Sequence, residues 1–130
     1  MSTGPTRFSC HLPADPAQLR PARHAISRWA ADAGLSSERV EDLALAVGEA
    51  LSNSIEHAYP SGTGAIELEG SLVDSILRVQ VRDHGCWREP HSHPGWRGRG
   101  ISMIYALADE ARMEGGAAGT VVTMCWRLRP

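Results

Sequence analysis

The sequence predicts an α+β fold, a two-layer sandwich in which a mixed, mainly antiparallel sheet carries about three helices on one face. Two long segments with helical periodicity come early in the chain, over residues 15–33 and 37–59. Two segments that alternate apolar and polar residues follow, and a short helix with two more strands completes the chain. Helices and hairpins without regular β-α-β alternation favour this class over a parallel α/β fold.

The predicted helices follow a first strand over residues 7–12. The first helix, over residues 15–33, ends at Gly34, because glycine readily adopts the left-handed conformation common after a helix C-terminus. Ser36 or Ser37 caps the second helix, and a Pro-Ser-Gly-Thr-Gly stretch ends it. The second helix has a wide apolar stripe made of Val40, Leu43, Ala44, Val47, Leu51, Ile55 and Ala58.

Two alternating strands then form a predicted hairpin with one buried and one solvated face. The inward positions are Ile66, Leu68, Gly70 and Leu72 in the first strand and Leu77, Val79 and Val81 in the second. On the solvated face polar and charged residues can pair across the hairpin, with Glu67 and Glu69 opposite Arg78, Gln80 and Arg82. The rest of the chain is predicted as a loop over 84–98, a helix over 101–108 and strands over 110–114 and 119–128.

Length and composition exclude several functions. A chain of 130 residues without repeats or long linkers predicts one domain over 1–130, with residues 1–5 as a flexible tail. Three cysteines without paired spacing, no signal peptide and no membrane-spanning run predict a cytoplasmic protein. A formal net charge of -2 gives no electrostatic footprint for nucleic acid. All 13 basic residues are arginine, which removes enzyme classes that need a lysine nucleophile or phosphate ligand.

The second predicted helix carries the most informative stretch of the sequence. Glu49, Asn53 and His57 are spaced four residues apart, which places a carboxylate, a carboxamide and an imidazole on one helix face. Such a stripe ordinarily faces solvent. Here Leu45 and Ala46 flank it, so the helix is apolar around most of its circumference, and a narrow polar stripe on a largely buried helix favours a pocket lining.

Two further polar residues have inward parity on predicted strands. Asp83 continues the buried face of its strand, where a carboxylate needs a hydrogen-bond donor such as a ligand's amine. The alternative is an aspartate that starts the turn before Gly85, and the segment alone favours neither interpretation. Thr120 is also predicted to point inward, although a lone inward threonine is most often a core residue bonded to the backbone.

A glycine-rich segment, Gly-Trp-Arg-Gly-Arg-Gly, leads into the predicted helix at Ile101. Its Gly98 and Gly100 allow close approach of the backbone, and Arg97 and Arg99 supplement the attraction of a helix N-terminus for an anion. On its own this is a weak signal, because most glycine-rich turns reverse the chain without binding a ligand. The GxxxxGK[ST] pattern of a P-loop is absent from the sequence, as is a kinase-type glycine loop with a strand lysine.

Taken in order, these segments resemble the GHKL, or histidine-kinase-like, ATPases. The fit is to the anti-sigma-factor serine-protein kinases of bacterial partner-switching systems, and it runs from the first strand to Trp126. The resemblance implies a Bergerat-type ATP-binding fold with an ATP lid over residues 84–98. The family's N box corresponds to Glu49-x-x-x-Asn53 followed by His57-Ala-Tyr, and its G1 box to Asp83-His-Gly85. The G2 box corresponds to Gly98-Arg-Gly100-Ile101, and the closing Gly-Thr of the family to Gly119-Thr120.

The resemblance also implies a role for each box. Asn53 would ligate Mg²⁺ through its amide oxygen and Glu49 would be the general base. Asp83 would accept a hydrogen bond from the adenine amino group, and the hydroxyl of Thr120 would help to hold adenine. The G2 backbone would wrap the phosphates of ATP. Mg²⁺ prefers hard oxygen ligands and retains water, which agrees with a single carboxamide ligand beside three phosphates.

The family implies partners as well: a sigma factor, a STAS-domain antagonist as phosphorylation substrate, and a second copy in a homodimer. Trp87 departs from the family pattern, because it stands where the G1 box usually has its second glycine. An alternative function is therefore a nucleotide-dependent protein-binding regulator without efficient kinase activity. A second alternative is a zinc site built from His84, Cys86, His91 and His93, although their spacing matches no familiar zinc motif.

Overall fold

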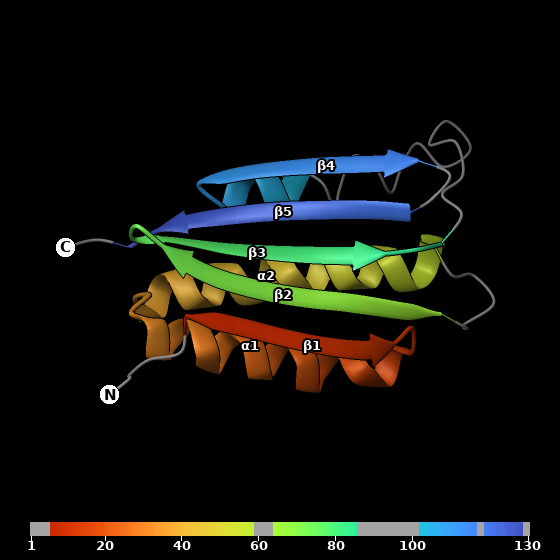
Figure 1. Cartoon of the computed structure of the whole chain (residues 1–130), viewed down its shortest axis with the longest axis horizontal. Helices are drawn as coiled ribbons and strands as arrows, with labels where there is room; N and C mark the ends of the chain where they lie inside the picture. Colours follow the sequence, from red (N-terminus) through yellow and green to blue (C-terminus); the bar gives the residue numbers. More distant parts are fainter. Residues whose placement is uncertain (1–5, 59–63, 86–101, 117–118, 129–130) are drawn as a thin grey trace.

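Five strands form one sheet in the order β1-β2-β3-β5-β4. The computed structural model describes residues 6–58, 64–85, 102–116 and 119–128. Every strand pairing among these residues is antiparallel. The sequence predicted a mixed, mainly antiparallel sheet, and the described strands contain no parallel pair. The hairpin β2-β3 is central, and β5 returns beside β3 with β4 at the edge (Figure 1). The strands are β1 (Arg7–Pro13), β2 (Ala65–Val73), β3 (Ile76–Asp83), β4 (Glu110–Gly116) and β5 (Gly119–Arg127).

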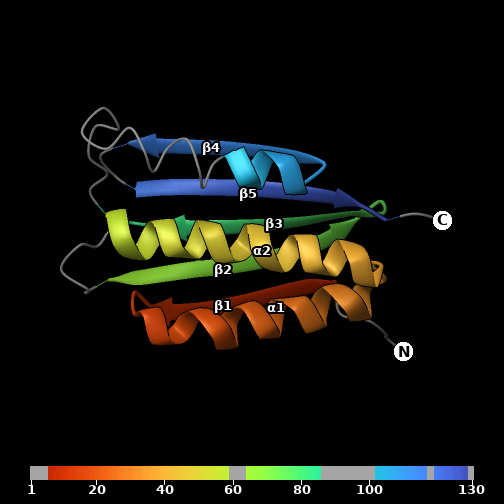
Figure 2. The same ribbon diagram turned by 180° about the vertical axis from the view of Figure 1, so that it is seen from behind.

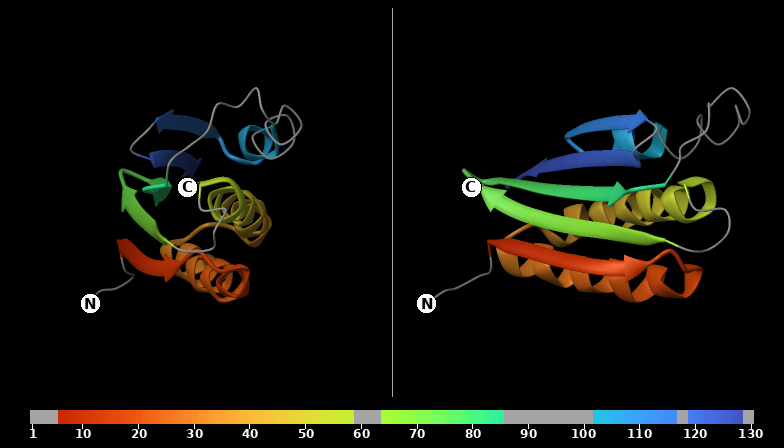
Figure 3. Two further views of the ribbon diagram at one scale, coloured as in Figure 1. Left: turned by 90° about the vertical axis from the view of Figure 1, so that its right-hand side faces the viewer. Right: turned by 45° about the vertical axis from the view of Figure 1, so that its right-hand side comes forward.

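The helices cover one face of this sheet and leave the other open (Figure 2). In this view α1 (Leu19–Ala33) lies in front of the sheet next to β1, α2 (Ser37–Asn53) lies over β2 and β3, and a helical segment over 102–107 lies over β4 and β5. Seen along the strands, the sheet and the helices form two layers (Figure 3). The α+β sandwich with helices on one face is therefore confirmed. No helix among the described residues is long and apolar enough to cross a membrane.

The predicted helix ends are close to the observed ones, with two differences in local geometry. Asp15 caps a 3-10 turn (Pro16–Gln18) that precedes α1, and Gly34 ends α1 with a φ of 114°. Ser36 caps α2, since its hydroxyl accepts a 3.3 Å hydrogen bond from the Arg39 amide. Beyond Asn53 the helix continues as a π turn over Ser54–Ala58 rather than as α-helix, and π turns are frequent at functional sites.

The core lies between the two layers and contains the predicted inward faces of the strands. In β2 and β3 only Leu72 among the predicted inward apolar residues is partly exposed. On the open face Glu67 forms its predicted pair with Arg82 at 3.6 Å. Leu45 is half exposed, so α2 is less apolar around its circumference than the sequence suggested. The fully buried strand residues are Ile66, Leu68, Leu77, Val79, Val81, Met124 and Trp126.

Gly70 shows how closely α1 packs against the sheet. A Cβ atom on Gly70 would lie 2.6 Å from Cζ3 of Trp29, which is closer than non-bonded carbon atoms approach. The Trp29 ring also contacts Phe8 of the edge strand, at a centroid distance of 5.9 Å. The glycine therefore provides the space into which α1 inserts its only tryptophan.

We expect Gly70→Ala to lower the free energy of unfolding by about 1–3 kcal/mol, because the added methyl group overpacks a filled core. Urea denaturation monitored by far-UV circular dichroism measures the change. Gly116→Ala is the matched control, since a Cβ on Gly116 has no atom within 4 Å among the described residues, and it should be nearly neutral. Equal stabilities of the two variants would contradict the packing argument.

Candidate functional site

A buried carboxylate lies where β3 ends. Asp83 is 3% exposed and pairs in register with Ile66 of β2 and Thr120 of β5. Its Oδ1 accepts hydrogen bonds from the backbone amides of Gly85 and Thr120, both at 3.2 Å. Its Oδ2 accepts a hydrogen bond from the Ser54 hydroxyl at 2.8 Å. The carboxylate thus connects β3, the start of β5 and the π turn that follows α2.

Burial raises the pKa of the Asp83 carboxyl above its ordinary value of 3.8, because the charged form loses its hydration. The hydrogen bonds from Ser54, Gly85 and Thr120, followed by the charge of His84, oppose this rise in pKa. A buried carboxylate destabilises a fold unless donors surround it. Its retention at the end of a core strand favours a role in binding over a role in stability.

The start of β5 fits closely against the end of β3. Gly119 has a φ of 133°, a backbone conformation that residues other than glycine rarely adopt. A Cβ on Gly119 would lie 2.1 Å from the backbone oxygen of Asp83. The glycine thereby allows Thr120 to donate its amide to the Asp83 carboxylate.

Two buried polar atoms near this cluster have no hydrogen-bond partner in the part of the chain that the structure describes. They are Oγ1 of Thr120 and Nδ2 of Asn53, and Asn53 directly precedes Ser54 in the chain. Buried polar groups in folded proteins are nearly always paired with protein, water or ligand. The end of β3, the start of β5 and the end of α2 therefore present unsatisfied polar atoms beside a buried acceptor, as expected for a ligand site.

The polar face of α2 leads away from this cluster. Glu49 is half buried and lies one helical turn before Asn53, so both share a face of α2 as the spacing predicted. His57 belongs to the π turn Ser54–Ala58, where the backbone bonds i to i+5. The side chain of His57 is outside the described residues.

Two hollows of the described residues lie on the open face of the sheet. One of about 270 Å³ is lined by residues of β3, β4 and β5, and one of about 450 Å³ by residues of β1, β2 and β3. Both include Arg78 and Gln80, whose side chains point away from the helices. Asp83 has the opposite parity, so these grooves are separate from the buried cluster.

The sequence profile described as the histidine kinase-like ATPase domain matches residues 12–126. The chain belongs to this family. The match spans all three segments of the buried cluster, and the predicted resemblance to GHKL anti-sigma-factor kinases is confirmed. A serine-protein kinase RsbW of Bacillus licheniformis is 34% identical over 125 residues, which cover 84% of this chain and 78% of the relative.

Further relatives and solved structures support membership of the histidine kinase-like ATPase family. A serine-protein kinase RsbW of Listeria monocytogenes is 37% identical over 86 residues, 65% of this chain, and the match spans about half of the relative (55%). The crystal structure of the RsbU and RsbW domains of Rv1364c from Mycobacterium tuberculosis superposes with a TM-score of 0.74 at 30% identity, over 95% of this chain and 33% of that one. The Acinetobacter baumannii histidine kinase AdeS shares the fold alone, with a TM-score of 0.56 at 9% identity over 93% of this chain and 68% of that one.

The histidine kinase-like fold brings some of the predicted site residues together. Asp83, Gly85 and Thr120 are in direct hydrogen-bond contact, and Asn53 adjoins them through Ser54. The predicted G2 residues Arg97, Gly98, Arg99, Gly100 and Ile101 lie outside the described residues. Of the alternative zinc ligands only His84 is described, and Cys86, His91 and His93 lie outside.

Ser54 is the member of the buried cluster that the sequence did not lead us to predict. Ser54 is 6% exposed, and its hydroxyl donates a hydrogen bond to Asp83. This bond fixes the orientation of the carboxylate. A signal was present: Ser54 follows Val47, Ala50 and Leu51 at helical spacing, so it is a polar residue on the apolar face of the helix. A serine at a core position needs a partner, and Asp83 is that partner.

We expect Asp83→Asn to gain stability relative to the natural chain as pH rises. The unfolded carboxyl titrates near 3.8 and the folded one at a higher pH, so between these values the folded chain binds more protons and its stability falls with rising pH. Asparagine does not titrate, and it can preserve the local bonds because the Ser54 hydroxyl can accept as well as donate. Urea denaturation between about pH 3 and pH 7 measures the difference.

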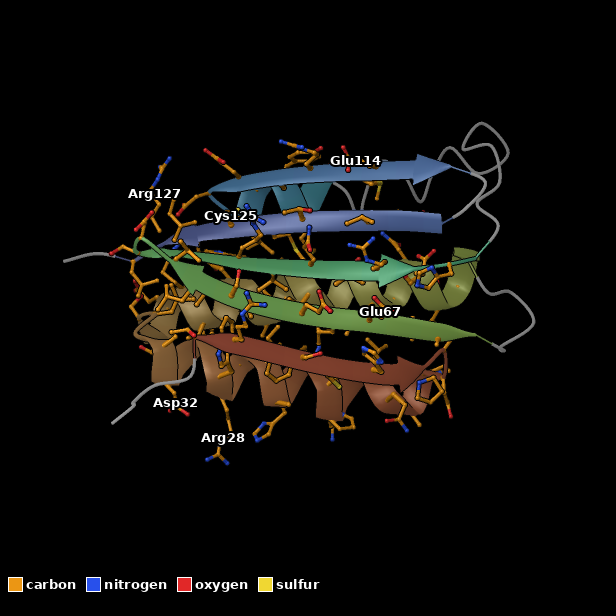
Figure 4. All side chains as sticks on the ribbon, in the orientation of Figure 1. Arg28, Asp32, Glu67, Glu114, Cys125 and Arg127 are labelled. Carbon is orange, nitrogen blue, oxygen red and sulfur yellow. The ribbon has the colours of Figure 1, made fainter. Side chains whose placement is uncertain are left out.

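Asp32→Asn is the control for this series, because Asp32 is exposed on α1 (Figure 4). Its stability difference from the natural chain should vary little with pH. A stability loss in Asp83→Asn that grows toward pH 7 would mean that the ionised carboxylate stabilises the fold, and would refute the assigned direction.

Proposed function

We propose that this chain binds ATP with Mg²⁺ and phosphorylates a serine or threonine of a STAS-domain antagonist, and that it sequesters a sigma factor as the alternative partner. The observation that carries the proposal is the buried Asp83 carboxylate, which accepts hydrogen bonds from Ser54 and two backbone amides. It lies beside a Thr120 hydroxyl that has no partner within the described ranges of the chain. The sequence similarity to RsbW serine-protein kinases supports phosphoryl transfer to serine and the proposed partners. We also propose the homodimer of that family for this chain.

The adenine end of the site is proposed at Asp83 and Thr120. Oδ1 of Asp83 already accepts hydrogen bonds from two backbone amides. Among the described residues Oδ2 accepts only from Ser54, which leaves it a lone pair for a ligand. An exocyclic amine would donate to that lone pair, and the Thr120 hydroxyl would take a ring nitrogen or a bridging water. A guanine would present a carbonyl oxygen to Asp83 instead, so this acceptor favours adenine.

The phosphate end is proposed along α2 at Asn53 and Glu49. Asn53 fits a Mg²⁺ ligand through its carboxamide oxygen, which is a hard donor atom. Its Nδ2 is buried without a partner among the described residues and would donate a hydrogen bond to a phosphate oxygen. When bound, Mg²⁺ would neutralise charge on the phosphates. Glu49, one turn earlier and half buried, would accept the proton of the attacking hydroxyl as general base.

The remaining phosphate contacts are proposed for the segment that contains Gly98, Gly100 and Ile101, with Arg97 and Arg99. This part of the proposal rests on the sequence motif. The chain has no lysine, so backbone amides and arginine would meet the phosphate charge.

A nucleotide-dependent regulator without efficient phosphoryl transfer is the second candidate. Trp87 favours it, because a bulky residue replaces the usual second glycine of the G1 box and restricts the backbone there. Both candidates use the same adenine site, so only a transfer assay separates them.

We expect the natural chain to bind Mg·ATP and Mg·ADP in calorimetry and Asp83→Asn to bind them at least about tenfold more weakly. The amide nitrogen of asparagine would face the adenine amine, and two donors cannot pair. Asp32→Asn serves again as the control and should bind as the natural chain does. Absence of binding by the well-folded natural chain, or unaltered binding by Asp83→Asn, would refute the proposed site.

We expect Glu49→Gln to lower the rate of phosphate transfer to a STAS-domain antagonist by about 100-fold or more while nucleotide affinity is retained, because glutamine cannot accept the proton. Radiolabel transfer from ATP measures the rate. Glu41→Gln, two turns earlier on α2 and exposed, is the matched control and should transfer normally. Full activity of Glu49→Gln would exclude Glu49 as the base. Absence of transfer by the natural chain despite nucleotide binding would favour the regulator.

A further inference from the structure

The open face of the sheet carries a group of potential metal ligands outside the proposed nucleotide site. Glu67 projects from β2 toward solvent on this face (Figure 4). His11 of β1 is its direct cross-strand partner, and Glu69 follows two residues later on the same face of β2. One ligand atom each from His11, Glu67 and Glu69 lies within 4.8 Å of the other two. An imidazole and two carboxylates thus converge from two adjacent strands.

The backbone fixes this convergence. The antiparallel register of β1 and β2 holds the Cα atoms of His11 and Glu67 opposite each other. Zn²⁺ binds imidazole nitrogen and carboxylate oxygen at about 2.0–2.2 Å. Donor atoms already within 4.8 Å of one another need only small rotations of partly exposed side chains to reach a common ion.

A second imidazole lies beside the group. Nε2 of His84, just after β3, is 3.3 Å from Oε2 of Glu67. The other oxygen of Glu67 lies 3.6 Å from Nε of Arg82, a distance typical of a weak surface ion pair. A divalent cation would compete with one arginine for Glu67 and would gain a second carboxylate from Glu69.

We propose that His11, Glu67 and Glu69, with His84 as a fourth donor, form a binding site for a borderline divalent cation such as Zn²⁺. Imidazole ligands favour Zn²⁺, Ni²⁺ or Co²⁺ over Mg²⁺ and Ca²⁺, which take oxygen ligands. The site is distinct from the proposed Mg²⁺ ligand Asn53, because its residues lie on the open face whereas Asp83 and α2 lie on the helix side. It also differs from the zinc set suggested by the loop histidines His91 and His93.

Titration of the full chain with Zn²⁺ against a chromophoric chelator, in excess Mg²⁺, tests the site. We expect one saturable equivalent. His11→Ala and Glu69→Gln should each weaken Zn²⁺ binding by about tenfold or more, as expected when a metal site loses a ligand. His24→Ala is the matched control, since His24 is exposed on α1, and it should retain full affinity. Far-UV circular dichroism checks that each variant is folded.

The double variant His91→Ala, His93→Ala separates this site from the loop set and should also retain the affinity. Co²⁺ provides an independent readout, because its visible absorption reports nitrogen and oxygen coordination and should be lost in His11→Ala. Three results would overturn the proposal: no saturable Zn²⁺ binding, unchanged affinity in both His11→Ala and Glu69→Gln, or loss of binding only in the double variant.

Discussion

The architecture of the site depends on one constraint, a carboxylate that remains inside a protein core. Asp83 occupies a strand position that would stabilise the fold more if it were apolar, and it can remain only because three donors surround it. Those donors come from the π turn after α2, from Gly85 two residues after the end of β3, and from β5. Segments that are distant in sequence must therefore meet at one point for the carboxylate to be tolerated.

The close packing of the sandwich is what makes this meeting precise. Gly119 allows β5 to begin directly against the backbone of Asp83, and Gly70 allows α1 to press its tryptophan onto the central sheet. At the other end of the molecule Asp109 accepts Arg39 of α2 at 2.6 Å and the Arg127 amide of β5 at 2.8 Å. Helix α2 is thus held relative to β5 at both ends, and the distance between Asn53 and Thr120 is set by the fold rather than by either residue.

Most of the fold was predictable because periodicity reports burial. Alternation identified β2, β3 and β5. Gly34 and Ser36 marked the end of α1 and the start of α2 to within a residue. Parity also identified Asp83 and Thr120 as inward residues. Ser54 was not predicted because it lies on the apolar side of the helix, whereas the polar stripe that predicted the site contains Glu49 and Asn53. The π turn could not be predicted, since it depends on how the end of α2 meets the sheet and not on local propensity.

The alternation of strand residues also separates two chemistries at the same end of the sheet. Asp83 points to the helices and is buried, whereas its neighbour His84 points to the open face and contacts Glu67. A buried site of low dielectric suits an uncharged purine edge that needs one strong acceptor, because few waters compete for the hydrogen bond. A solvated cluster of carboxylates and imidazoles suits a cation, because its charge stays hydrated on one side. The two proposed sites are therefore neighbours in sequence but opposite in environment, and a ligand of one class would not be accommodated in the other.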